Sequence, residues 1–542
     1  MRRTKIWLPA AAISLALVVA GCGGGEGGDD PDGGTPPDTK GGSFSVSSSE
    51  PEAFAPTSAC YSSDCSQIID LVFTGLLRTN PETQEQELLM AESIETEDSQ
   101  NYTITIKEGF TFHNGEPVTA QSFVDAWNYT AYGPNATQLG FFFSKVEGYD
   151  DLQGEKPKAE EMTGLTAPDD LTIEVALTEP FSQFASTLSY TPAAAPIAKE
   201  CMDDIKACNE QPIGNGPYQF AGPWNHNQSI ALERYPDYSD DATAGNADAI
   251  EFKIYADLKT AYRDYQGGNL DIVAAPDPSQ VPQARAQYPD QILEVDSGSF
   301  SYIGFPFYEE AYQDVRIRQA LSLAIDRQAI IDRVLFGRYI PALDVISPFV
   351  PGSREDACAT CVYDAEEAKR LYDEAGGLPN DELTLYFNND GGHEDWTQAV
   401  AQGWKEVLGV ETQFESQPFT PYLNQLGTQS EVKGPYRLGW LPDYPSAQNY
   451  LDPIYGEGSS NYGKWEGPEH EAFLDLVNQG DQTADAEEAV SLYQEAADVV
   501  LENQVVIPLW FGQTFVIFSE NVDNVAYSPT NQLLLADVTA SS

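Results

Sequence analysis

The sequence predicts a mixed α/β fold spread over more than one domain, and two observations support this. Segments with the period-two spacing of strands alternate with segments that have the 3.6-residue spacing of helices. The chain after residue 42 holds about five hundred residues, more than one hydrophobic core usually organises. Two or three domains are therefore expected.

Three segments have the pattern of strands. Residues 102–107 (YTITIK) and 171–177 (LTIEVAL) alternate polar and apolar side chains, and Pro180 follows the second segment as a stop. Residues 505–511 (VVIPLWF) form a nearly unbroken apolar run, which is typical of a buried strand.

Three longer segments have the pattern of amphipathic helices. Residues 315–335 place their apolar side chains on one stripe. Residues 395–407 repeat this pattern and are followed by Gly409, a residue type that commonly ends helices. Residues 486–501 form the third predicted helix and lead into the apolar run at 505–511.

The N-terminus resembles the signal of a bacterial lipoprotein. Its first five residues carry three cations and precede an apolar run at 6–20, which is short for a bilayer span. The run ends in residues 19–22 (VAGC), which match a lipobox, where cleavage occurs before a cysteine that then receives lipid. We therefore expect residues 1–21 to be a signal peptide and Cys22 to carry the lipid.

A tether is predicted between this lipid and the folded body. Residues 22–42 are rich in Gly, Pro and Asp and offer no apolar face to bury. A flexible coil of about twenty residues spans roughly 25 Å on average. No later apolar run is long enough for a transmembrane helix, so membrane contact is expected through the anchor alone.

The other six cysteines fall into three close pairs. Local disulfides are the simplest outcome for such pairs outside the cytoplasm. The expected pairs are Cys60 with Cys65, Cys201 with Cys208, and Cys358 with Cys361. The third pair also allows a CxxC redox motif, although its neighbours are Gly, Pro and Asp rather than a strand-to-helix turn. We expect no metal and no cofactor, since a zinc site built on two CxxC units is absent.

The chain is strongly acidic. Its formal net charge of −57 becomes −60 once the three cations of the signal are removed. This charge excludes nucleic acid as a partner, because binding to phosphates needs basic residues. It also disfavours contact between the folded body and an anionic membrane, and it keeps the protein soluble.

One carboxylate stands out in residues 436–445 (YRLGWLPDYP). Asp443 lies between Trp440 and Tyr444 and is flanked by two prolines. A carboxylate taken out of water is costly unless a cation meets it. Asp443 therefore caps a turn, pairs with a cation of the protein, or is available to a positively charged ligand. The prolines favour a turn that is stiff before any ligand binds.

Several segments in order resemble one family. They are residues 107–120 (KEGFTFHNGEPVTA), 212–218 (PIGNGPY), 232–238 (LERYPDY), 315–327 (VRIRQALSLAIDR) and 437–444 (RLGWLPDY). Together they resemble the solute-binding proteins of ABC importers, in the peptide-binding cluster (family 5) that includes the oligopeptide- and dipeptide-binding lipoproteins. The resemblance covers nearly all of the mature chain.

This resemblance implies a fold and a domain division. The fold is a two-lobed α/β fold of the periplasmic-binding-protein type (class II, cluster C) with an extra domain in the N-terminal lobe. Lobe 1 is expected to comprise residues 43–80, 185–298 and 508–542, and lobe 2 residues 299–507. The extra domain attached to lobe 1 is expected at residues 81–184.

The resemblance also implies roles for individual residues. Asp443 matches the aspartate that pairs with the α-ammonium of a bound peptide, and Arg437 would help to receive the peptide carboxylate. The backbones of Gly439 and Leu441 would pair with an extended peptide, as a strand adds to a sheet edge. The remaining implied site residues are aromatic residues of the cleft and a histidine near the C-terminal end of the peptide: Trp440, Tyr444, Phe419 and His393.

The implied function is that of a receptor without catalytic activity. It would bind peptides between its lobes and deliver them to an ABC permease, as a monomer on the outer face of the bacterial cell membrane. Two alternatives stay open: the same scaffold with a sugar or a metal chelate as ligand, and an extracytoplasmic hydrolase. The hydrolase is less favoured because the sequence contains neither HExxH nor GxSxG.

Overall fold

The computed structural model describes residues 41–541 except 56, 61, 81–85, 241–242, 275, 390–391, 429–430, 457–460, 484 and 529–531. The predicted signal peptide and Cys22 lie outside the described residues, as does the predicted tether except for its last two glycines. None of the described helices combines the length and the apolar character that crossing a bilayer requires.

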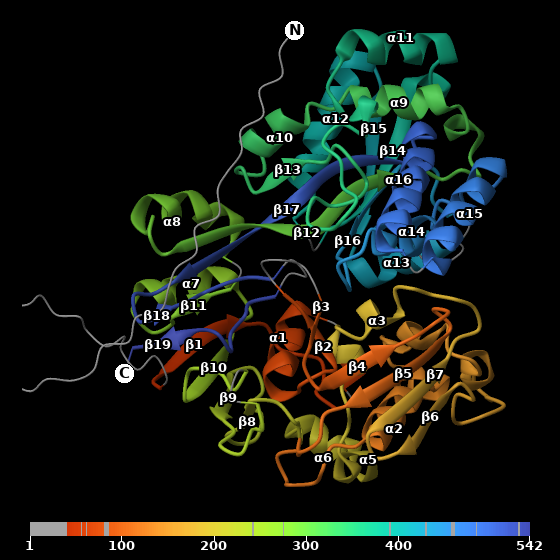
Figure 1. Cartoon of the computed structure of the whole chain (residues 1–542). Helices are drawn as coiled ribbons and strands as arrows, with labels where there is room; N and C mark the ends of the chain where they lie inside the picture. The colour runs from red at the N-terminus through yellow and green to blue at the C-terminus, as the bar shows by residue number, and fades with distance from the viewer. Residues whose placement is uncertain are drawn as a thin grey trace, which may run out of the picture. The chain divides into compact units, whose positions relative to one another are not determined.

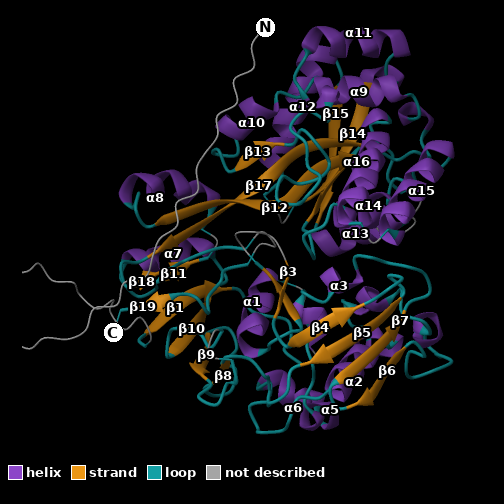
Figure 2. Cartoon of the chain, in the orientation of Figure 1, coloured by secondary structure: helices purple, strands orange, loops and turns teal. Residues whose placement is uncertain are grey.

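The largest element is an eleven-stranded mixed sheet (Figure 1, Figure 2). Its strands follow the order β15 (Glu411–Gln417), β14 (Glu382–Asn388), β16 (Tyr436–Trp440), β12 (Ile292–Gly304), β17 (Val506–Phe518), β11 (Ile272–Val273), β1 (Ser43–Ser48), β10 (Ala249–Ile254), β9 (Ser229–Arg234) and β8 (Tyr218–Phe220), with β13 (Tyr339–Pro341) added to β17.

Two long antiparallel strands, β12 and β17, connect the two ends of this sheet (Figure 1). Beyond β12 lie β16, β14 and β15, whereas β11, β1, β10, β9 and β8 lie beyond β17. The register between the two long strands shifts between Asp296 and Phe300 and again between Ser301 and Tyr302. Such irregularities bend a strand and increase its twist. The predicted lobe boundaries at 298/299 and 507/508 fall on these strands, and they stay predictions.

A second sheet of four antiparallel strands lies within residues 91–176. Its order is β4 (Ala91–Glu95), β5 (Asn101–Ile106), β7 (Thr172–Ala176) and β6 (Leu165–Asp169). Helix α2 (Ala120–Ala131) packs against β6 and β7 and begins with a capping box formed by Thr119 and Ser122. This sheet and helix belong to a hydrophobic cluster whose buried members all come from residues 55–208.

The other helices flank the two sheets (Figure 2). They are α1 (Ser63–Val72), α3 (Phe184–Thr187), α4 (Thr191–Ala194), α5 (Lys199–Asp203), α6 (Ile205–Glu210), α7 (Leu258–Gln266), α8 (Val281–Gln287), α9 (Val315–Leu323), α10 (Arg327–Arg333), α11 (Ala365–Ala375), α12 (Glu394–Leu408), α13 (Phe419–Gly427), α14 (Gln448–Tyr455), α15 (Pro468–Gln482) and α16 (Ala486–Glu502). Two short two-stranded sheets, β2 (Leu77–Thr79) with β3 (Gln86–Leu88) and β18 (Val522–Asp523) with β19 (Thr539–Ala540), complete the described fold.

Most predicted elements are confirmed. The strands expected at 102–107, 171–177 and 505–511 correspond to β5, β7 and the first half of β17, and the helices expected at 395–407 and 486–501 correspond to α12 and α16.

The prediction of a single helix at residues 315–335 is wrong. The chain forms α9 and α10 there, with a break at residues 324–326. The Asp326 carboxylate accepts a hydrogen bond from the backbone N–H of Ala329 at 3.0 Å and so caps the start of α10. The apolar stripe continues across the break, which is why spacing alone did not reveal it.

The three predicted disulfides are confirmed. Cys60–Cys65, Cys201–Cys208 and Cys358–Cys361 have Cα–Cα distances of 5.6, 5.4 and 5.3 Å. The last bond lies at the 3-10 helix η7 (Ala359–Cys361), not at a strand-to-helix turn.

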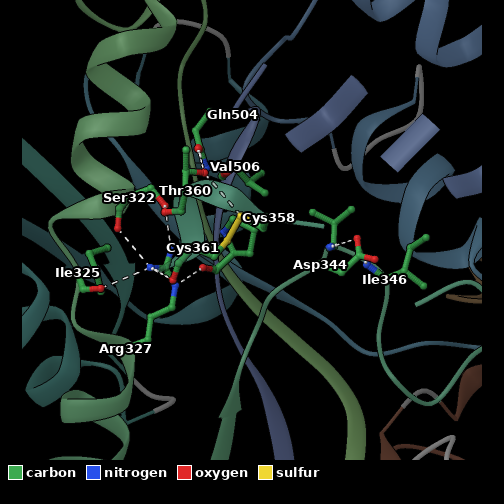
Figure 3. The surroundings of a disulfide bond; sticks show 12 residues. Ser322, Ile325, Arg327, Asp344, Ile346, Cys358, Thr360, Cys361, Gln504 and Val506 are labelled. Carbon is green, nitrogen blue, oxygen red and sulfur yellow. Dashed lines mark hydrogen bonds between the residues drawn. A yellow bond between two sulfur atoms is a disulfide. The ribbon is translucent and has the colours of Figure 1, made fainter. Parts of the chain in front are cut away.

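A buried arginine joins three parts of the larger sheet region (Figure 3). The guanidinium of Arg327 donates hydrogen bonds to the backbone carbonyls of Pro508 at 2.7 Å, Cys361 at 2.9 Å and Ser322 at 3.2 Å. It also donates to the Ser322 hydroxyl at 2.9 Å. Burial lowers the pKa of Arg327 to about 9, so the side chain remains charged at neutral pH. Arg327 therefore holds α10, the start of β17 and the Cys358–Cys361 loop together.

We expect Arg327→Met to lower the free energy of unfolding by about 3 kcal/mol or more, because it leaves several buried carbonyls without their donor. Urea denaturation followed by circular dichroism measures the change. Arg333→Met removes the same charge from the exposed end of α10 and is the control, with a change within about 0.5 kcal/mol. Equal stability of the two variants would contradict the structural role of Arg327.

Candidate functional site

Strand β16 presents an edge that is largely without a partner strand. Along one side β16 pairs with β12 over its whole length. On the other side its pairing with β14 is limited to Tyr436. From Arg437 to Trp440 no described strand continues this ladder, although the Tyr422 hydroxyl donates a hydrogen bond to the Arg437 carbonyl at 2.7 Å. An edge of this kind can receive an extended segment.

The loop after β16 is fixed by Asn449, a buried residue of α14. Its Oδ1 accepts hydrogen bonds from the backbone N–H of Asp443 at 2.9 Å and from Trp440 Nε1 at 3.3 Å. Its Nδ2 donates to Asp443 Oδ2 at 3.4 Å. The Asp443 carboxylate is therefore positioned by a neutral amide.

No ion pair among the described residues includes Asp443. Burial raises the pKa of the Asp443 carboxyl to about 6, and the hydrogen bond from Asn449 opposes this rise. At neutral pH the carboxyl is mostly ionised and has no cation beside it. Of the three possibilities raised by the sequence, the absence of a neighbouring cation favours a carboxylate that is available to a cationic ligand.

Asp443 faces a cavity of about 170 Å³. The other walls come from distant parts of the sequence: Gln67 and Asp70 of α1, residues 189–191 and residues 532–537. In the predicted division Asp443 belongs to lobe 2, and these other segments belong to lobe 1. The cavity thus lies where two parts of the chain far apart in sequence meet.

The two aromatic neighbours of Asp443 differ in their surroundings. Trp440 is half-buried, and its indole N–H is held by Asn449. Tyr444 is buried, and its hydroxyl donates to Gln448 Oε1 at 2.6 Å. Tyr444 lines a second cavity of about 100 Å³, together with Phe141, Phe142 and Phe181 among others.

Residues 85–462 match the family described as "Bacterial extracellular solute-binding proteins, family 5 Middle". This match spans well over half of the chain. The chain belongs to this family.

Known proteins and solved structures are similar to the chain over most of its length. The chain is 28% identical to the oligopeptide-binding protein OppA of Bacillus subtilis (strain 168), covering 86% of this chain and 87% of that protein. It is 25% identical to the heme-binding protein A of Haemophilus influenzae, covering 84% and 85%. The structure of Haemophilus influenzae OppA in complex with the peptide RPPGFSPFR has a TM-score of 0.74 at 22% identity, covering 92% and 99%. The predicted α/β fold class is confirmed.

In this family 5 protein the predicted site residues Arg437, Gly439 and Leu441 lie close to Asp443 in sequence but have separate contacts. Arg437 Nη1 donates to Asn388 Oδ1 at 3.0 Å. A Cβ on Gly439 would lie 3.1 Å from the Phe300 carbonyl oxygen and 3.2 Å from Arg437 Nη2, so glycine permits close packing here. Leu441 is 39% exposed.

His393 and Phe419 do not line the Asp443 cavity. His393 precedes α12, and its Nδ1 accepts a hydrogen bond from Trp396 Nε1 at 3.1 Å. Phe419 opens α13 and is 42% exposed. The assignment of both residues to the site stays a prediction.

One group of described residues has the ligand count for a metal ion, and it offers no metal site. Glu52 lies near Cys60 and Cys65, but the two sulfurs are bonded to each other.

Three residues around Asp443 were not predicted from the sequence. Asn449 lies six residues after Asp443, where a loop ends and a helix begins, and only its contacts reveal its role. Gln67 and Asp70 lie three residues apart on α1, so they share one helix face, but nothing in the sequence connects that face with residue 443.

We expect Asn449→Ala to raise the pKa of the Asp443 carboxyl above about 6, because the hydrogen bond that stabilises its ionised form is removed. A ¹³C-carboxyl titration by NMR, with the signal assigned by its absence from Asp443→Asn, measures this pKa. Asn424→Ala, at an exposed position of α13, is the control and leaves it unchanged. An unaltered titration in Asn449→Ala would contradict the positioning role.

Proposed function

We propose that this protein is a lipid-anchored extracytoplasmic receptor that binds peptides between its lobes and delivers them to an ABC import permease. The observation that carries the proposal is Asp443, which lies in no ion pair of the described residues, faces a cavity and follows by three residues the part of β16 that has no second partner strand. Such an edge can pair with the backbone of an extended peptide, and such a carboxylate can pair with its terminal ammonium.

The remaining site residues contact the peptide at successive points along its length. Gly439 and Leu441 offer backbone groups to the peptide, and Trp440 and Tyr444 form apolar walls next to its first residues. Arg437 receives the peptide carboxylate, since a guanidinium can bind a carboxylate through two parallel hydrogen bonds. His393 and Phe419 contact the peptide further toward its C-terminal end.

The cellular setting in this proposal rests on the sequence and the family. Cleavage before Cys22 and its lipidation hold a monomeric body on the outer face of the cell membrane. The body comprises lobe 1 at 43–80, 185–298 and 508–542, the extra domain at 81–184, and lobe 2 at 299–507. The protein performs no catalysis, and its partner is the membrane permease.

We expect Asp443→Asn to weaken binding of Ala-Ala-Ala by about thirtyfold or more, because the peptide ammonium loses a partly buried charged partner worth about 2–5 kcal/mol. N-acetyl-Ala-Ala-Ala should bind the unaltered protein as weakly. Isothermal titration calorimetry on the purified chain measures both.

Asp475→Asn, at an exposed position of α15, is the matched control and keeps the original affinity. Retention of full affinity by both Asp443→Asn and the acetylated peptide would sink the proposed ammonium site. If a thermal-shift screen found stabilisation by sugars, heme or metal chelates and by no peptide, a non-peptide ligand would replace the proposal.

We also expect affinity for Ala-Ala-Ala to fall about tenfold between pH 7 and pH 5. The Asp443 carboxyl, with a pKa of about 6, is mostly ionised at the higher pH and mostly protonated at the lower one, whereas the peptide ammonium stays charged. Calorimetry across this range tests the expectation, and Asp443→Asn should show a much flatter profile. An affinity independent of pH would contradict an ionised Asp443 as the partner.

A further inference from the structure

A second carboxylate, from a segment far from Asp443 in the sequence, lines the same cavity. Asp70 belongs to α1 and is half-buried in the cavity wall. No ion pair among the described residues includes it; the Thr191 side chain is its hydrogen-bond partner. Burial raises the pKa of the Asp70 carboxyl to about 6, and the bond to Thr191 opposes this. Asp70 is thus in the same electrostatic situation as Asp443.

The Tyr190 phenol lines the same cavity as the two carboxylates. The hydroxyl of Tyr190, which also lines the cavity, is hydrogen-bonded to the Ser66 hydroxyl at 3.3 Å. Burial raises the pKa of Tyr190, and the negative charges of Asp443 and Asp70 raise it further.

An uncharged polar group in the same wall lacks a protein partner. Gln67 lies one helical turn before Asp70 and is only 6% exposed. None of the described residues forms a hydrogen bond with its side-chain amide. The amide atoms of Gln67 are not among the fully buried polar atoms without a partner, so the amide is accessible from the cavity and can hydrogen-bond to a ligand there.

The cavity offers little positive charge of its own. Arg78 is the one described arginine or lysine in its wall, and Arg78 Nε is bound to Glu87 Oε2 at 2.7 Å. Asp537 adds a third carboxyl to the wall. The cavity therefore favours a cation with more than one positive group.

The volume limits what can enter. Pockets that enclose a whole drug-sized ligand measure about 300–1,000 Å³. At about 170 Å³ this cavity holds one end of a peptide or one small molecule.

We propose that this cavity is a two-point cation site in which Asp443 binds one ammonium and Asp70 binds a second, with the Gln67 amide oxygen accepting a hydrogen bond from the second. The inference rests on the proposed function and names its ligand class: peptides whose first residue carries a basic side chain, so that two ammonium groups lie at one end. A free diamine has the same chemistry and is distinguished by experiment.

Calorimetry with Lys-Ala-Ala and norleucine-Ala-Ala tests the inference, because the two first residues match in length and differ in the terminal ammonium. We expect Lys-Ala-Ala to bind at least tenfold more tightly to the unaltered protein. In Asp70→Asn this ratio should fall to about threefold or less. Asp64→Asn, on the same helix and outside the cavity wall, is the control and keeps the ratio. The comparison in the unaltered protein does not depend on any variant folding.

The outcomes separate the two proposals. If both peptides bind equally and in an Asp443-dependent way, the two-point site is overturned while the proposed function stands. If neither peptide binds, the proposed function fails, and binding of 1,5-diaminopentane then tests the two-point site. Binding that depends on Asp70 supports the site, and absence of binding overturns it. Tighter binding of the diamine than of Lys-Ala-Ala identifies a free diamine as the ligand.

Discussion

The pairing of β12 with β17 is the interaction on which the rest of the structure depends. Each strand is thirteen residues long, and together they connect the strands on both ends of the sheet. The pairing is interrupted near its middle, where Gly512 approaches the hydroxyls of Ser297 and Ser299 so closely that a side chain there would collide with them. The connection is therefore regular at both ends and irregular at the centre, which is where the hinge of the proposed two-lobed receptor would lie.

A carboxylate without a cation is costly inside a protein, and in the proposed function this cost is tied to ligand recognition. A pKa raised from 3.8 to about 6 corresponds to roughly 3 kcal/mol. Because the folded-state pKa lies above the unfolded one, Asp443 lowers stability as pH rises through about 4 to 6, and the loss is complete above this range. A bound ammonium removes this penalty. The free energy that the buried carboxylate costs the ligand-free fold therefore favours the binding of cations over neutral ligands.

Much of the fold could be predicted from the sequence, because period and composition report directly on strands, helices and disulfides. The break between α9 and α10 could not, because Asp326 reads as one more polar position in a helical stripe until its hydrogen bond to Ala329 is seen. Asp443 could be singled out since a local motif surrounds it. Asn449, Gln67 and Asp70 could not, because their importance comes from contacts across the fold rather than from spacing along the chain.

Asp443 and Asp70 differ from most carboxylates of this acidic chain. With a formal net charge of −57, carboxylates on the surface are common and are solvated. Surface charge of this kind is screened beyond about 10 Å and selects no particular ligand. Asp443 and Asp70 differ from it in one respect, since burial raises the pKa of both and leaves each without a cation. In the proposed receptor, discrimination among ligands therefore depends on the few carboxylates that the fold removes from water. Helix α1 and the β16–α14 loop each supply one of them to the same cavity.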